Sequence, residues 1–163
     1  MDRINTIETI EELQNNGKCF YIDILPETIE NERYFELEEF MLKMYLKKFS
    51  EKMGRIIVKI ITYYDSEIYI ADLPEGYKGK LSSFLPWTDI RSESLEKIYE
   101  TIIDVIDEAV TSMEILVKGS LQFLISINGE FSVEIYGLPS DDYALIRELI
   151  EQEGLYFKEY SEE

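Results

Sequence analysis

The sequence predicts a single α+β domain, with a mainly antiparallel sheet of five to six strands and helices packed on one face. Three observations support this prediction. Apolar and polar side chains alternate over residues 121–136 on both sides of Asn128-Gly129, which is typical of a β-hairpin with one buried face. Over 92–113, apolar residues recur every three to four positions, as in an amphipathic helix. The 163 residues, 45% of them hydrophobic, are enough for one core.

The chain begins with a short predicted helix and a strand. Asn5 is in the position of an N-cap, and Glu8 follows it at the spacing of a capping box. The next segment, 18–25, is rich in strand-forming residues and is closed by Pro26. We therefore expect helix and then strand before residue 27.

A long helix is expected at 27–53, because apolar positions recur at helical spacing and Gly54 follows as a stop. The segments 55–64 and 67–73 are rich in β-branched and aromatic residues, which favours a second hairpin. Residues 27–73 would then form a helix–hairpin unit. Residues 92–136 are expected to form another.

Residues 74–91 between these units have no period and contain two of the four prolines. A loop this long inside a compact domain is uncommon, and it often has a function. It carries the only tryptophan, Trp87, which is a candidate anchor for a binding partner. The alternative is a lid packed on the core.

The register of the 121–136 hairpin follows from its two apolar sets. A two-residue turn at Asn128-Gly129 would place the apolar set of one strand opposite the polar set of the other. A three-residue loop, 127–129, brings the apolar faces together, with Gly129 in a left-handed conformation. The predicted pairs are Ser126–Glu130, Ile125–Phe131, Phe123–Val133 and Leu121–Ile135.

The C-terminal part predicts one more helix and one more strand. Ser140 is a candidate N-cap for a helix at 140–153, with Gly154 as its stop. Residues 155–160 suit a short edge strand.

Charge is the most unusual property of the chain. Thirty-four acidic residues against 16 basic ones leave a net charge of −18. Residues 92–163 hold 17 of the acids and only four bases, a net charge of −13. Such a surface repels nucleic acid and anionic lipid, and it attracts basic proteins. We therefore expect a basic protein as partner, without direct binding of nucleic acid or membrane.

Several functional classes lack the residues that they need. The chain has no histidine, which excludes serine–histidine and cysteine–histidine catalysis, and we expect no catalytic residue, metal or other cofactor. The single cysteine, Cys19, suggests no disulfide, the polar N-terminus does not resemble a signal peptide, and no apolar run reaches the roughly 18 residues of a membrane span. A cytoplasmic location is the expectation.

The candidate binding site is a row of acids on the helix predicted at 92–113. Successive members stand one helical turn apart, roughly 6 Å, which is similar to the spacing of phosphates on a nucleic-acid strand. Like charges at this spacing destabilise a helix, so selection for stability alone would favour mixed signs. The candidate partner-binding residues, besides Trp87, form the acidic ridge: Glu93, Glu96, Glu100, Asp104, Asp107 and Glu108.

We expect a non-enzymatic, acidic inhibitor that masks a basic, nuclease-like protein by mimicking nucleic acid. In size, acidity and aromatic content the chain is similar to bacterial immunity proteins, which implies a toxin as partner. A phage-encoded inhibitor fits equally. Two alternatives stay open: a small carboxylate- or Mg²⁺-dependent enzyme using acids near 65–72 or 104–108, and a structural or adaptor subunit whose acidity only serves solubility.

Overall fold

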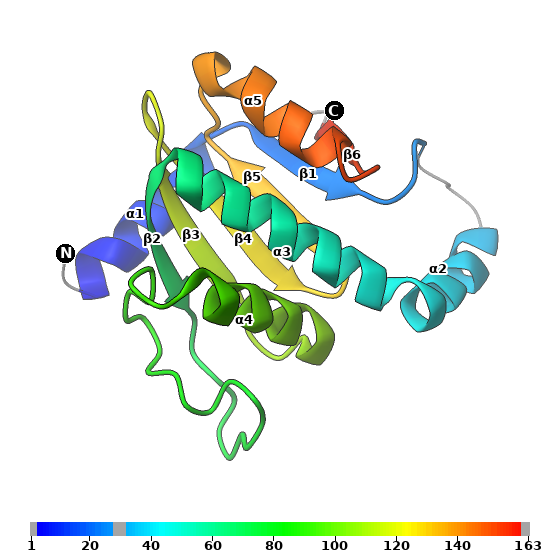
Figure 1. The fold of residues 1–163 in the computed structure, drawn as a ribbon, viewed down its shortest axis with the longest axis horizontal. Helices are drawn as coiled ribbons and strands as arrows, with labels where there is room; N and C mark the ends of the chain where they lie inside the picture. The colour runs from blue at the N-terminus through cyan, green and yellow to red at the C-terminus, as the bar shows by residue number, and fades with distance from the viewer. Residues whose placement is uncertain (1–2, 28–31, 161–163) are drawn as a thin grey trace.

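The computed structural model describes residues 3–27 and 32–160, and these form a single α+β domain, as predicted (Figure 1). All strand pairs of the six-stranded sheet are antiparallel, in the order β2-β3-β4-β5-β1-β6. The elements are α1 (Arg3–Asn16), β1 (Cys19–Asp23), α2 (Arg33–Met44), α3 (Leu46–Tyr63), β2 (Asp65–Ile70), α4 (Leu95–Glu108), β3 (Met113–Lys118), β4 (Gln122–Gly129), β5 (Ser132–Tyr136), α5 (Ser140–Glu151) and β6 (Tyr156–Glu159).

Helices α3, α4 and α5 cover one face of the sheet and enclose the main core with it (Figure 1). The opposite face has a smaller apolar cluster under α1, in which Ile10 packs with residues of β2, β3 and β4. Along β2, β3, β4 and β5 the side chains alternate between the two clusters. Leu124, which the hairpin pattern placed on an outer face, is therefore buried under α1.

Residues 55–63 are helical, which corrects the strand predicted at 55–64. The buried residues of α3 recur at helical spacing from Phe49 to Ile61, so one apolar stripe continues through Gly54. Gly54 does not stop the helix; a Cβ atom there would lie 2.6 Å from the ring of Tyr99, so glycine permits close approach of α4. Burial of this stripe outweighs the β preference of its isoleucines. The predicted hairpin at 55–73 does not form.

The predicted helix 27–53 is also divided. Its residues 28–31 lie outside the described part of the chain, and α2 ends at Met44. Tyr45 leaves the helical conformation, with φ −127° and ψ −15°, and α3 then begins at Leu46.

The predicted helix 92–113 ends early, and an unpredicted strand, β3, begins at its last residue. Helix α4 stops at Glu108 because Ala109 adopts a left-handed conformation, with φ 50° and ψ 40°. No glycine or proline marks this stop. Met113 then begins a strand that is buried as far as Val117 and pairs with both β2 and β4.

The β4–β5 hairpin exists, but its predicted register is wrong. Ile125 lies opposite Ile135 rather than Phe131, and β4 continues to Gly129, which pairs with Ser132. A bulge between Ile127 and Gly129 adds a residue to β4, so the apolar faces still coincide. The turn is formed by Glu130 and Phe131, in place of the predicted three-residue loop 127–129.

Candidate partner-binding surface

Helix α4 carries most of the acidic ridge on a rigid support. Its N-cap Ser94 accepts a hydrogen bond from the Lys97 backbone N–H at 3.1 Å. Ile98, Ile102 and Ile106 on its inner side are fully buried in the main core. This anchoring holds the outward side chains at fixed spacing, which lowers the ordering cost of binding.

Four acids of the ridge follow one another at i, i+4 spacing: Glu96, Glu100, Asp104 and Glu108. They do not stay on one line along α4. Each step of four residues turns about 40° beyond a full circle, so the row winds around the helix. Asp104 and Glu108 are thereby carried toward the 74–91 loop, and both are half-buried. The remaining ridge residues, which we call the solvent-facing acids, are Glu93, Glu96, Glu100 and Asp107.

The 74–91 loop partners the two acids that turn toward it. The Lys80 ammonium lies 3.6 Å from the Asp104 carboxylate. Glu108 accepts hydrogen bonds from the Tyr77 hydroxyl and from the Lys80 backbone N–H, the latter at 3.2 Å. These acids therefore hold the loop against α4, and they are less available to a partner than the solvent-facing acids.

The only base in α4 does not neutralise its acids. The Lys97 ammonium lies over the ring of Phe84, 5.4 Å from its centroid. Within residues 3–27 and 32–160, none of the solvent-facing acids forms an ion pair with lysine or arginine. Their charge is therefore directed at solvent.

Trp87 lies on the other side of the sheet from α4. The 74–91 loop wraps around the edge of β2, where the backbone N–H of Trp87 bonds to the Ile70 carbonyl at 2.8 Å. The indole packs on the α1 cluster beside Tyr69 and Leu116, whereas Phe84 packs on the main core. The structure thus separates Trp87 from the acidic ridge, and the two belong to different surfaces.

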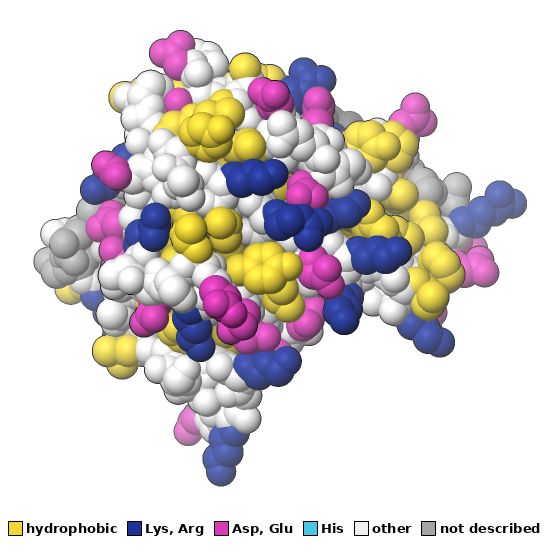
Figure 2. All heavy atoms as spheres, in the orientation of Figure 1, with side chains coloured by type: hydrophobic (Ala, Val, Ile, Leu, Met, Phe, Trp, Pro, Cys, Tyr) yellow, Lys and Arg dark blue, Asp and Glu magenta, His cyan; other side chains and the backbone are white. Residues whose placement is uncertain are grey.

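A line of bases runs along α3, beside α4. Figure 2 shows lysine and arginine side chains across the middle of this face of the molecule. Their spacing of four, three and four residues keeps them on one side of the helix. The helical face therefore carries both signs of charge, which restricts the solvent-facing acids to a narrow acidic strip. The bases are Lys48, Lys52, Arg55 and Lys59.

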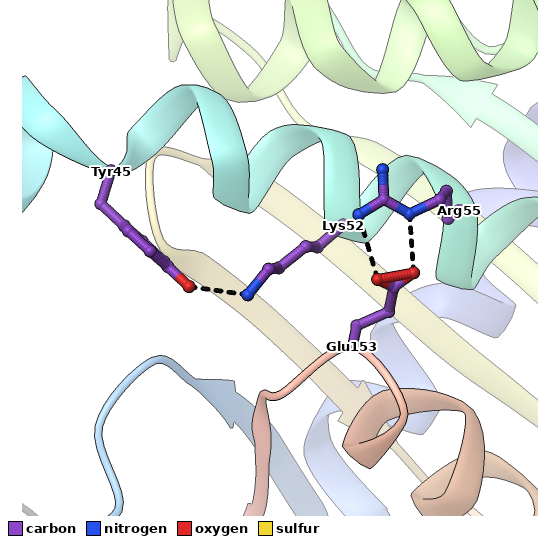
Figure 3. A network of polar contacts seen from close by, with 4 residues as sticks. All are labelled: Tyr45, Lys52, Arg55 and Glu153. Atoms are coloured by element: carbon purple, nitrogen blue, oxygen red, sulfur yellow. Dashed lines mark hydrogen bonds and ion pairs between the residues drawn. The ribbon is translucent and has the colours of Figure 1, made fainter.

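Two of these bases have partners within the chain (Figure 3). The Lys52 ammonium donates to the Tyr45 hydroxyl at 2.7 Å. Arg55 makes a bidentate pair with Glu153, with Nε–Oε1 and Nη2–Oε2 distances of 2.7 and 3.0 Å. The guanidinium lowers the pKa of Glu153, and the pair ties α3 to the turn between α5 and β6.

Replacing Arg55 by glutamine should destabilise the protein by about 1 kcal/mol at neutral pH, because the Arg55 side chain is 45% exposed and the pair is partly screened. The lowered pKa of Glu153 makes this stability present above the unfolded pKa and absent once pH falls through the folded value. Urea unfolding at neutral and acidic pH measures the effect. A difference between wild type and R55Q that persists undiminished in acid would contradict the assignment.

A polar row crosses the sheet on the α1 face, and the sequence analysis missed it. The register places Glu114 opposite Ser126, Ser126 opposite Glu134, and Glu134 opposite Tyr21. Both Ser112 and Ser126 donate to one Glu114 oxygen at 2.9 Å, while the other oxygen is buried without a partner. Ser126 and Glu134 belong to the predicted hairpin, but Glu114 is in a strand that was not predicted and Tyr21 is distant in sequence, so no local pattern reveals the row.

Next to this row, Cys19 and Tyr136 both donate hydrogen bonds to Glu134. Burial, with the charge of Glu134, raises the pKa of the Cys19 thiol to about 11. The thiol is therefore protonated at neutral pH and is a poor nucleophile. Burial also raises the pKa of Tyr136. This arrangement favours a structural role for both residues.

In the described part of the chain, no group of three or more histidine, cysteine, aspartate or glutamate side chains is placed to hold a metal ion. The acids considered for a magnesium-dependent enzyme, near 65–72 and 104–108, are accordingly not gathered in such a group. No helix over residues 3–27 and 32–160 has the length and hydrophobicity needed to cross a membrane.

No protein-family model, curated protein or solved structure matches the chain. The solvent-facing acids and their surroundings are therefore the features that indicate a function.

Proposed function

We propose that the protein is a non-enzymatic, acidic inhibitor that binds and masks a basic protein, as a bacterial immunity protein does to a nuclease-like toxin or a phage-encoded inhibitor does to a host protein. The observation that carries the proposal is the set of solvent-facing acids on a rigid helix. None of them forms an ion pair with lysine or arginine among the described residues, and the ammonium of the only base in α4 lies over the Phe84 ring instead.

The geometry favours a particular kind of partner surface. The acids follow the axis of α4, with the basic line of α3 beside them, so a complementary surface is a narrow basic ridge or cleft wall. A nuclease cleft that follows one nucleic-acid strand has this charge pattern. A broad basic surface would meet the α3 bases and be repelled.

Reversing Glu96 and Glu100 to lysine together should weaken partner binding about 10²–10⁴-fold, because close charge pairs across an interface contribute several kcal/mol. The wild-type protein is used to isolate the partner, and calorimetry then compares wild type with E96K/E100K. A nuclease assay on the isolated partner tests whether binding masks its activity. The melting temperature should stay unchanged or rise, because like-charge repulsion along α4 is relieved.

The matched control is E11K/E12K, which makes the same change of charge on exposed positions of α1. It should retain most of the affinity if the α4 acids make the contact. If both variants bound the partner equally weakly, the loss of affinity would come from the change in net charge and not from the position of the acids. Unaltered binding by E96K/E100K would exclude the α4 surface.

A further inference from the structure

Helix α2 is the least buried helix of the domain. None of the residues of α2 is buried, and the helix packs on α3 at the end of the molecule, beyond the sheet (Figure 1). Three of its apolar side chains are largely exposed: Phe35 by 72%, Phe40 by 57% and Met44 by 59%. Large apolar side chains gathered on one short element are unusual on the surface of a monomer and mark an interaction site.

The two sides of α2 have different environments. Leu37 and Met41, with Tyr34, turn inward and line a small cavity of about 50 Å³ together with Phe131. The opposite side presents an outward strip at the i, i+3, i+4, i+7 spacing of one helix face. This outward strip consists of Glu36, Glu39, Phe40 and Lys43, and Phe35 and Met44 lie on the two opposite flanks of it.

Charge along the outward strip changes sign from one end to the other. Glu36 and Glu39 are in the first half of α2, and Lys43 is in its last turn. A copy of the same helix in antiparallel orientation therefore presents base opposite acid and acid opposite base. With a two-fold axis between positions 39 and 40, Glu36 faces the partner's Lys43.

The same two-fold axis brings apolar side chains together at the centre of the pair. It sets the two Phe40 side chains, each 57% exposed, close to the axis. A symmetric interface requires a patch that is complementary to itself, and the outward strip meets this requirement in both charge and apolar content. A partner of a single charge sign would match only one half of the strip.

We propose that α2 is a self-association surface, through which two copies of the chain form an antiparallel, two-fold helix pair. The inference does not depend on the proposed function, because it uses α2 rather than the solvent-facing acids of α4. One short helix pair buries less than a typical stable interface of about 1,200–2,000 Å², so the dimer should be weak. We expect it at micromolar to millimolar concentration.

Sedimentation velocity at physiological salt, which screens the net charge of the two copies, provides the test. The wild type should change from monomer to dimer as its concentration rises. Each of E36K and K43E should remain monomeric, since each places like charges opposite one another. An equimolar mixture of the two variants should dimerise again, because both pairs then join a lysine of one copy to a glutamate of the other.

The matched control is E12K, which reverses one exposed acid on α1 and should dimerise like the wild type. Circular dichroism checks that E36K and K43E keep the native helix content. A wild type that stays monomeric at millimolar concentration would overturn the proposal. So would dimerisation of either single variant, or a mixture that fails to associate.

Discussion

Replacing Gly129 by alanine will destabilise the protein by about 2–6 kcal/mol, because a positive φ and overpacking each cost about 1–3 kcal/mol. Gly129 has φ +102°, and a Cβ atom there would lie 2.7 Å from the Cα of Ala109. The neighbouring Glu130 N–H bonds to the Ile106 carbonyl at 2.9 Å, so the turn lies directly on the end of α4. Neither backbone can move away without losing this contact.

Urea unfolding of G129A and wild type measures the loss, and a melting temperature lower by about 2–4 °C per kcal/mol should accompany it. The control is G76A. Gly76 also has a positive φ, +78°, but an added Cβ would meet nothing within 4 Å. G76A therefore incurs only the backbone strain, and an equal loss in both variants would show that the approach to Ala109 costs nothing.

The second large effect concerns Glu114, which is 5% exposed in the middle of the sheet. Burial raises the pKa of this carboxyl from 4.5 to about 7; the Ser126 and Ser112 hydroxyls oppose the shift, and Glu134 adds to it. The folded state therefore binds a proton more tightly than the unfolded state. Stability from this group is complete below pH 4.5 and is lost as pH rises through 7, a change of about 3 kcal/mol.

Replacing Glu114 by glutamine removes the charge and keeps the shape of the protonated group. E114Q should match the wild type near pH 4.5 and exceed its stability by up to about 3 kcal/mol at pH 8. Urea unfolding across this pH range gives the two curves. For E11Q, on the exposed side of α1, the curve of stability against pH should be parallel to that of the wild type. If the curve of E114Q were parallel as well, Glu114 would have no raised pKa in the folded protein.

The elements with local signals were predictable from the sequence. The 121–136 hairpin, α5 at 140–151 and the final strand all have period, cap or turn residues that identify them. The failures come from tertiary contacts. The segment 55–64 has the composition of a strand, but the apolar stripe that begins at Phe49 makes residues 55–63 helical. Ala109 ends α4 in a left-handed conformation that favours glycine. No glycine or proline therefore marks the end of α4, and β3 was not predicted after it.

The candidate site shows the same division. The acids of α4 could be recognised from their spacing, because they belong to one helix. Their sorting into solvent-facing acids and loop partners depends on Tyr77 and Lys80, which are about 30 residues away in the chain. The side of the sheet on which Trp87 lies depends on how the loop passes the edge of β2. Neither the contacts of Tyr77 and Lys80 nor the path of the loop can be predicted from the local sequence.

The position of β1 in the sheet has a consequence for synthesis on the ribosome. This strand, at Cys19–Asp23, lies between β5 and β6, whose residues are made more than a hundred positions later. Strands β2, β3 and β4 can pair as they emerge, but β1 has neither neighbour until β5 has been made. Residues of β5 and β6 therefore complete the hydrogen bonding of a strand made more than a hundred positions earlier, and such non-local pairing slows folding.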